Sequence, residues 1–396
     1  MKPKPEVTTM IQRRFSTGQL LYFSLLCAAV LFFGAGFLCF PQQTAGGVSS
    51  GLSLCLYTLI PSTFPFVVLS SFCVYSGVSR LLGKLLQPIT KLLFHLPGCC
   101  GSVILLGWLG GYPTGARGIV SLYQHGSITR QQGERMLWFC INGGPSFLIS
   151  VVGMGIYGSA SFGLLLFICQ TGALLLIGIV SGIVSRWRKE PTLAQQNRGS
   201  PKKPFAEALV QAADDGARGA LNLCSFVMLF TAMLEPLYSS GILSWIAEML
   251  QKLSVPAPAA TVLFPLCWEI TSGVNFAGSV GISPALLLFF TAAGGLCVLG
   301  QITAATTPLG ISKIKLLLSR LLHGGVSLLL FLPLRRFFYT PDQITSVFHS
   351  TTEPLSSAFS AGGTTPLTTG ICGVTLLLLC IVFLLCKKRP GLAKIR

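Results

Sequence analysis

Apolar runs of roughly 17 to 25 residues, each long enough to cross a bilayer as a helix, recur along the whole chain. Several of them are short or are interrupted by Gly and Pro. The pattern predicts an all-α, polytopic integral membrane protein with about 8–10 transmembrane or re-entrant helices, some of them broken. The expected spans are 20–40, 51–77, 92–110, 136–155, 160–185, 219–240, 257–271, 283–303, 313–334 and 371–386.

Basic residues are concentrated at the edges of these runs. The chain has 28 Lys and Arg against 11 Asp and Glu, which gives a net charge of +17. The basic residues stand in short clusters beside apolar runs rather than along one face of a helix, a distribution typical of cytoplasmic segments that set membrane topology. We therefore expect a lipid bilayer, and no nucleic acid, as the partner of the chain.

The 14 Cys and 4 His residues give no sign of a metal site or a disulfide framework. Most Cys residues lie inside apolar runs and no CxxC occurs, so we interpret them as reduced apolar side chains. The histidines His95, His125, His323 and His349 have no Cys partner at ligand spacing, and we expect them at the membrane interface. We predict no metal and no cofactor.

A charged, polar linker divides the chain near its middle. We predict an N-terminal basic segment with a first transmembrane helix (1–45), a first repeat (46–186), the polar linker (187–214), a second repeat (215–335), and a polar loop with a C-terminal helix and basic tail (336–396). Sequence does not decide whether the repeats are parallel or inverted, and a homo-oligomer is an option that it leaves open.

The two halves show the same features in the same order. Ser76-Gly77 and Ser240-Gly241 each follow an apolar span and precede an amphipathic segment, and Trp108 corresponds to Trp268. Helix-start signals come next, with Thr129 and Gln132 as a capping box and Ser283-Pro284 as an N-cap followed by proline. A Gly pair follows each start, Gly143-Gly144 and Gly294-Gly295. This order favours duplication over chance similarity.

Four apolar stretches are broken by Gly, Pro or polar residues: GGYPTG, INGGPS, EITSGVN and GQITAATTP. Backbone groups freed by such breaks persist in hydrocarbon only when they are buried in protein or line a polar cavity. Broken segments of paired repeats commonly meet around the solute of a secondary transporter. The alternative is close helix packing through small residues. We predict a solute site formed by Gly110, Gly111, Tyr112, Pro113, Thr114, Gly115, Asn142, Gly143, Gly144, Ser146, Glu269, Ser272, Asn275, Gln301 and Thr306.

Individual residues in this set have more than one interpretation. Glu269, in an apolar context, carries a coupling proton or pairs with an Arg. Asn142 hydrogen-bonds the solute or caps the helix break. Gln301 and Thr306 face a cavity or satisfy freed backbone groups. Arg117, just beyond a broken segment, attracts an anion or sets topology.

The stretch "LGGYPTGARGIVSLYQHGSITRQQGERMLWFCINGGPSFLISVVG" resembles the sporulation integral membrane protein family, whose two halves are nucleoside-recognition or Gate domains. "EITSGVNF" and "TPLGISKIKLLLSRLLHG" resemble its second half. The resemblance implies a transporter of dipicolinic acid in the outer membrane around the developing spore. Arg117, where a Lys is common, and Gly143-Gly144, in place of a more polar pair, depart from the family pattern.

Two features agree with transport of a small anionic solute. Broken helices expose N-terminal N–H groups that suit carboxylates, and few acidic side chains would oppose an anion. The alternatives are a nucleoside-type permease and a structural or assembly protein of the spore envelope. The chain has no HExxH, no GxSxG and no paired aspartates in adjacent spans, so we predict that it is not an enzyme.

Overall fold

The computed structural model describes residues 17–190 and 203–338, and all regular elements in those ranges are helical. Five helices are long and apolar enough to cross a membrane, or up to seven spans if each of two bent helix pairs is one span. The predicted all-α polytopic class is therefore confirmed. Residues 371–386, expected as a last span, and His349 lie outside the described ranges.

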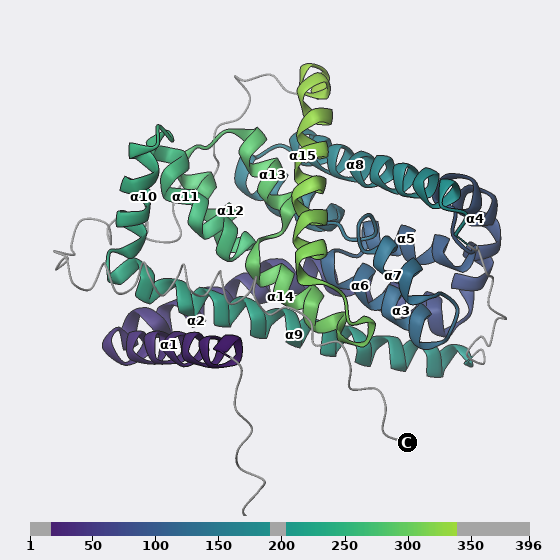
Figure 1. Cartoon of the computed structure of the whole chain (residues 1–396), viewed down its shortest axis with the longest axis horizontal. Coiled ribbons are helices and arrows are strands. Elements are labelled where there is room, and N and C mark those ends of the chain that lie inside the picture. The colour runs from purple at the N-terminus through teal and green to yellow at the C-terminus, as the bar shows by residue number, and fades with distance from the viewer. Residues whose placement is uncertain (1–16, 191–202, 339–396) are drawn as a thin grey trace, which may run out of the picture.

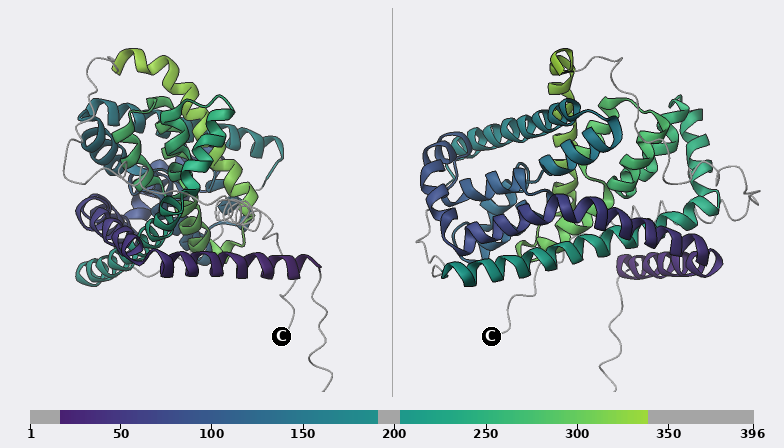
Figure 2. Two further views of the ribbon diagram at one scale, coloured as in Figure 1. Left: turned by 90° about the vertical axis from the view of Figure 1, so that its left-hand side faces the viewer. Right: turned by 180° about the vertical axis from the view of Figure 1, so that it is seen from behind.

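The first half begins with helix α1, continues with two bent helix pairs and several short helices, and ends with a long helix. Its elements are α1 (Thr17–Cys39), α2 (Pro41–Leu54), η2 (Cys55–Leu59), α3 (Ile60–Tyr75), α4 (Val78–Phe94), α5 (Cys99–Leu109), α6 (Tyr112–Gln124), α7 (Arg130–Met136), η3 (Ser146–Ile156) and α8 (Ala160–Trp187). Helix α1 extends away from the bundle in Figure 2, left, and much of its apolar surface is exposed. That surface suits contact with lipid.

The second half begins with α9 (Phe205–Ser239), so residues 205–214, predicted as the end of the linker, are helical. The elements that follow are α10 (Ile242–Lys252), α11 (Ala257–Trp268), α12 (Ile270–Val280), α13 (Pro284–Ala293), α14 (Gly295–Ala305), η4 (Thr307–Leu309) and α15 (Lys313–Phe338). In Figure 1, α9 runs along the lower edge and α15 stands upright across the middle of the molecule.

Helices α2 and α3 pack along α9, as the rear view in Figure 2 also shows. Small residues make the close approach of α2 possible. A Cβ atom on Gly47 would lie 3.0 Å from the Thr231 carbonyl oxygen, and one on Gly51 would lie 3.1 Å from the Met228 Cα. Glycine at these positions lets two helix backbones meet, as is common between membrane helices.

The elements of the two halves follow one another in a similar order. Gly77 (φ 82°) and Gly241 (φ 76°) adopt left-handed backbone conformations just before the amphipathic helices α4 and α10. Such φ values favour glycine because it has no Cβ. Trp108 donates to the Phe139 carbonyl at 2.6 Å, and Trp268 donates to the Phe230 carbonyl at 3.0 Å. Duplication of the two halves stays a prediction.

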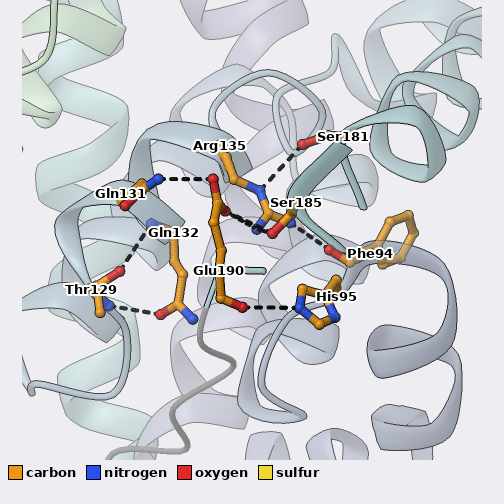
Figure 3. A network of polar contacts seen from close by, with 9 residues as sticks. All are labelled: Phe94, His95, Thr129, Gln131, Gln132, Arg135, Ser181, Ser185 and Glu190. Atoms are coloured by element: carbon orange, nitrogen blue, oxygen red, sulfur yellow. Dashed lines mark hydrogen bonds and ion pairs between the residues drawn. The ribbon is translucent and has the colours of Figure 1, made fainter. Parts of the chain in front are cut away.

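A cluster of polar contacts joins the ends of α4, α7 and α8 (Figure 3). Arg135 pairs with Glu190 at 3.1 Å and donates to Ser185 and to the Phe94 carbonyl. The predicted capping box is confirmed, since Thr129 and Gln132 exchange hydrogen bonds at the start of α7. At the start of α13, Pro284 holds the first helical position while the Ser283 side chain makes no capping bond.

Candidate functional site

A cavity of about 60 Å³ lies where the broken segments of both halves approach α3 and α9. At roughly 10–15 Å³ per water, it has room for several water molecules. Its walls are Leu59, Thr63, Phe64, Val67, Gly110, Gly111, Tyr112, Pro113, Thr114, Arg117, Gly143, Phe147, Gly216, Gly219, Ala220, Leu223, Val227, Glu269, Ile270, Thr271, Val298 and Gln301.

About half of the predicted site residues line this cavity: Gly110, Gly111, Tyr112, Pro113, Thr114, Gly143, Glu269 and Gln301. They come from the α5–α6 break, the loop before η3, the α11–α12 break and α14. Segments far apart in the sequence therefore meet at one space. Small and apolar residues of α9 also line this cavity.

The other predicted residues have different surroundings: Gly115, Asn142, Gly144, Ser146, Ser272, Asn275 and Thr306 are absent from the cavity wall. Asn142 is buried, accepts the Gly143 N–H at 2.9 Å and donates to the Thr171 hydroxyl at 3.2 Å, while helix η3 begins only at Ser146. Thr306 donates to the Ile302 carbonyl at 2.7 Å, so it satisfies its own helix. Gly115 packs against the Cys140 carbonyl, and Asn275 is exposed.

The hydroxyl hydrogens of Tyr112 and Thr114 are used within the protein. The Tyr112 hydroxyl donates to the Thr291 carbonyl of α13, and the Thr114 hydroxyl donates to the Gly110 carbonyl at 2.7 Å. Both acceptors lie next to a break, where backbone carbonyls lack their helical partners. The Tyr112 ring lies close to Gly143 of the first half and Gly294 of the second. Its position is therefore fixed by both halves.

In each half, the second glycine of the pair packs against the helix break of the same half. A Cβ atom on Gly144 would lie 3.0 Å from the Gly111 nitrogen, and one on Gly295 would lie 3.1 Å from the Leu266 carbonyl oxygen. Both glycines have positive φ, 75° and 62°. Close approach and left-handed geometry thus both favour glycine here.

Glu269 caps the second break with its side chain. Its carboxylate oxygens accept the N–H groups of Thr271 at 3.0 Å and Ser272 at 2.6 Å, at the start of α12. A carboxylate is favoured there because the N-terminal end of a helix is electropositive. Gly111 caps the first break at the start of α6 with no side-chain hydrogen bond. The two breaks face the same cavity with different charge.

Two comparisons relate this geometry to known proteins. The Gate family model, described as nucleoside recognition, matches residues 56–186, from within η2 to the end of α8. The chain is 26% identical over 376 residues to a sporulation integral membrane protein of Bacillus subtilis (strain 168). The match covers 85% of this chain and 90% of that protein. Both comparisons relate the chain to sporulation integral membrane proteins with a Gate domain. No solved structure matches the chain.

The Gate domain supplies a cationic side chain to the cavity. Arg117 lies in the second turn of α6, and the Asp215 carboxylate of α9 interacts with it electrostatically, without a hydrogen bond to its guanidinium among the described residues. Gly219 of α9 makes room for it, because a Cβ atom there would lie 2.8 Å from an Arg117 Nη1 atom. Sequence left Arg117 open between anion attraction and topology. Its position makes it available to an anion in the cavity.

Sequence reasoning missed a second arginine, Arg320 on α15, which packs against the Gate domain with no exposed surface. Its guanidinium donates to the carbonyls of Ile141 at 2.7 Å, Trp138 at 3.2 Å and Leu137 at 3.3 Å. These carbonyls belong to the non-helical segment before η3, so Arg320 replaces the helical partners they lack. A basic residue within an apolar span is the signal that could have identified it.

His323, expected at the membrane interface, is fully buried, so that prediction was wrong. It lies one turn after Arg320 on α15, and its ring nitrogens are 3.1 Å from the carbonyl oxygens of Ala292 and Gln170. Broken helices create buried carbonyls that need donors, and this demand draws His323 inward. Within the described ranges, no three His, Cys, Asp or Glu side chains are grouped to hold a metal ion.

Proposed function

We propose that this chain transports a small anionic solute, dipicolinic acid, across the outer membrane around the developing spore. The observation that carries the proposal is that Arg117 and the uncapped start of α6 line the same cavity. A guanidinium binds a carboxylate through charge-assisted hydrogen bonds, and helix N–H groups add to that attraction. The sporulation relative supports the cell biological context.

The cavity also suits an aromatic acid. Tyr112 and Phe147 contribute aromatic rings to its walls, and the α9 wall is formed by small or apolar residues. A planar ring with carboxylates presents an apolar face and a charged edge, which match these walls and Arg117. In the proposed mechanism, one helix bundle moves against the other, and the Gly and Pro breaks are the hinges.

The test is exchange of radiolabelled dipicolinate in proteoliposomes that contain the full chain. We expect faster exchange than in protein-free vesicles. R117Q should raise the half-saturating concentration by roughly 10- to 100-fold, because a hydrogen bond to a charged group contributes about 1.5–3 kcal/mol. R218Q is the matched control, since Arg218 is exposed on α9 and pairs with Asp214.

Equal rates with and without folded protein would defeat the dipicolinate proposal. Inhibition by a nucleoside, with none by dipicolinate, would favour a nucleoside-type permease. A structural or assembly protein of the spore envelope would give a third result: substitutions at Gly111, Pro113 or Asn142 would act only by lowering protein abundance.

A further inference from the structure

Helix α15 carries two buried donors, Arg320 and His323, one turn apart. Arg320 binds carbonyls of the first half, and His323 contacts Ala292 at the end of α13 as well as Gln170 on α8. The role of Arg320 as a permanent donor is fixed, because guanidinium does not lose its proton in proteins. His323 differs, because imidazole gains and loses a proton near neutral pH.

The two partners of the His323 ring are both acceptors. A backbone carbonyl cannot donate, and a neutral imidazole has one N–H and one lone pair. Only the doubly protonated ring donates to both the Ala292 and Gln170 carbonyls at 3.1 Å. In the neutral ring, one nitrogen lone pair would face a carbonyl oxygen. A proton added to the neutral ring would therefore find a carbonyl acceptor already in place.

The location adds a second preference for the charged ring. Ala292 lies in the last turn of α13, which ends at Ala293 before Gly294 with φ 89°. The C-terminal end of a helix carries partial negative charge and carbonyls without helical partners. A cation at this position stabilises the end of the half-helix. Loss of its proton removes that stabilisation.

A second cationic group, Arg320, lies one turn before His323 on the same helix. The helices packed against α15 are α8, α13 and α14. Helix α13 contains no titratable residue, α14 contains Cys297, and α8 contains Cys169 and, in its last turn, Arg186. The partners of the ring itself are the two backbone carbonyls, and an anion in the cavity would attract a proton at this position.

The His323 site is connected to the cavity through adjacent carbonyls. The Thr291 carbonyl accepts from Tyr112, a cavity residue, and the next carbonyl, Ala292, faces His323. The Gln170 side chain donates to the Thr291 hydroxyl at 2.9 Å, while the Gln170 carbonyl faces the ring. The Gln170 amide oxygen is buried without a partner within the described residues. The cavity wall and the imidazole thus share the end of α13.

We propose that His323 is a proton-binding site and that a proton crosses the membrane with the anion. The inference rests on the proposed function and adds its coupling ion. A proton from water on one side adds to the ring nitrogen that lacks one, and the same N–H bond breaks to water on the other side. The anion in the cavity and the proton on His323 have opposite charge, so each favours binding of the other, as linkage requires.

The test uses dipicolinate-loaded proteoliposomes with the membrane potential clamped at zero. Counterflow, in which internal unlabelled dipicolinate exchanges for external labelled dipicolinate without a pH gradient, is measured first. Accumulation under an imposed pH gradient is measured second. For wild type, we expect about tenfold accumulation per pH unit if one proton accompanies each anion. In H323Q, counterflow should persist while gradient-driven accumulation is lost. H125Q is the matched control, because His125 is exposed.

The two proposals fail in different ways. Absence of wild-type counterflow overturns dipicolinate transport. Counterflow with no response to the pH gradient, or accumulation by H323Q equal to wild type, overturns the proton site alone.

A second measurement covers the case in which H323Q does not fold. A variant with H95Q, H125Q and H349Q keeps His323 as the single histidine of the chain. The ¹⁵N shifts of its ring should change from neutral to doubly protonated when dipicolinate is added at pH 7. Shifts that stay unchanged in protein with measurable counterflow would contradict the proposal.

Discussion

The helix breaks at Gly110-Gly111 and at Glu269 face one cavity, yet they satisfy their backbones in opposite ways. Glu269 covers the start of α12 with its own carboxylate. The start of α6 has no side-chain cap, and Arg117 lies in the second turn of the same helix. The first break thus leaves a positive end for a solute anion, while the second is already neutralised by the chain. Under the proposed function, the first break is the binding end and the second is a structural end.

The largest expected effect comes from the uncapped break. Gly111 has φ 84° and ψ 176°, a conformation that is essentially restricted to glycine. G111L should abolish dipicolinate exchange while the protein stays in the membrane, because the start of α6 would be displaced from the cavity. The readout is flux in proteoliposomes alongside quantified membrane protein.

The matched control is G34L on α1, where a Cβ atom would meet nothing within 4 Å. Retained flux in G111L at normal protein levels would mean that the first break is not the binding end.

The capped break should respond through stability rather than binding. E269Q leaves one N–H of Thr271 or Ser272 without its acceptor and removes the charge at the start of α12, so we expect a loss of about 1–3 kcal/mol in unfolding free energy. Thermal unfolding in detergent measures it, with E248Q at an exposed position of α10 as control. A tenfold rise in half-saturation without loss of stability would instead assign Glu269 to the solute.

Tyr112 lies close to residues of both halves, and its substitution tests whether its hydroxyl binds the solute or stabilises the fold. Y112F keeps the ring but removes the donor to the Thr291 carbonyl. We expect a loss of roughly 1 kcal/mol in unfolding free energy and nearly unchanged half-saturation in the exchange assay. A large increase in half-saturation would show that the hydroxyl contacts the solute, as its sequence context suggested.

The sequence revealed the breaks because Gly, Pro and polar residues stand out in apolar runs. It identified the class of fold, and about half of the predicted site residues share the cavity. It could not reveal which residues satisfy the freed carbonyls, because Arg320 lies 179 positions from Ile141. His323 was misplaced for the same reason. Periodicity shows which face is apolar, but partners across the fold depend on tertiary packing.

The contribution of α9 also escaped sequence reasoning. Gly216 and Gly219 lie at the start of the predicted second repeat, and the sequence analysis assigned them no role at the site. In the fold they face Phe64 and Arg117 and shape the cavity. Small residues in a polar stretch carry no periodic signal, so their role becomes visible only when the neighbouring helix is in place.

The smallest expected effect concerns a carboxylate far from the breaks. Burial raises the pKa of Glu190, but hydrogen bonds from Ser185 and Arg135 and the charge of Arg135 outweigh it, so its pKa lies below the usual 4.5. A lowered folded-state pKa means that the carboxylate contributes stability above pH 4.5, and that this contribution is lost as pH falls through the folded pKa. Wild type should therefore lose more unfolding free energy than E190Q between pH 6 and pH 3. Parallel curves of unfolding free energy against pH would show that the ionised Glu190 carboxylate in the polar cluster of Figure 3 does not stabilise the fold. E269Q should still be destabilised at pH 6.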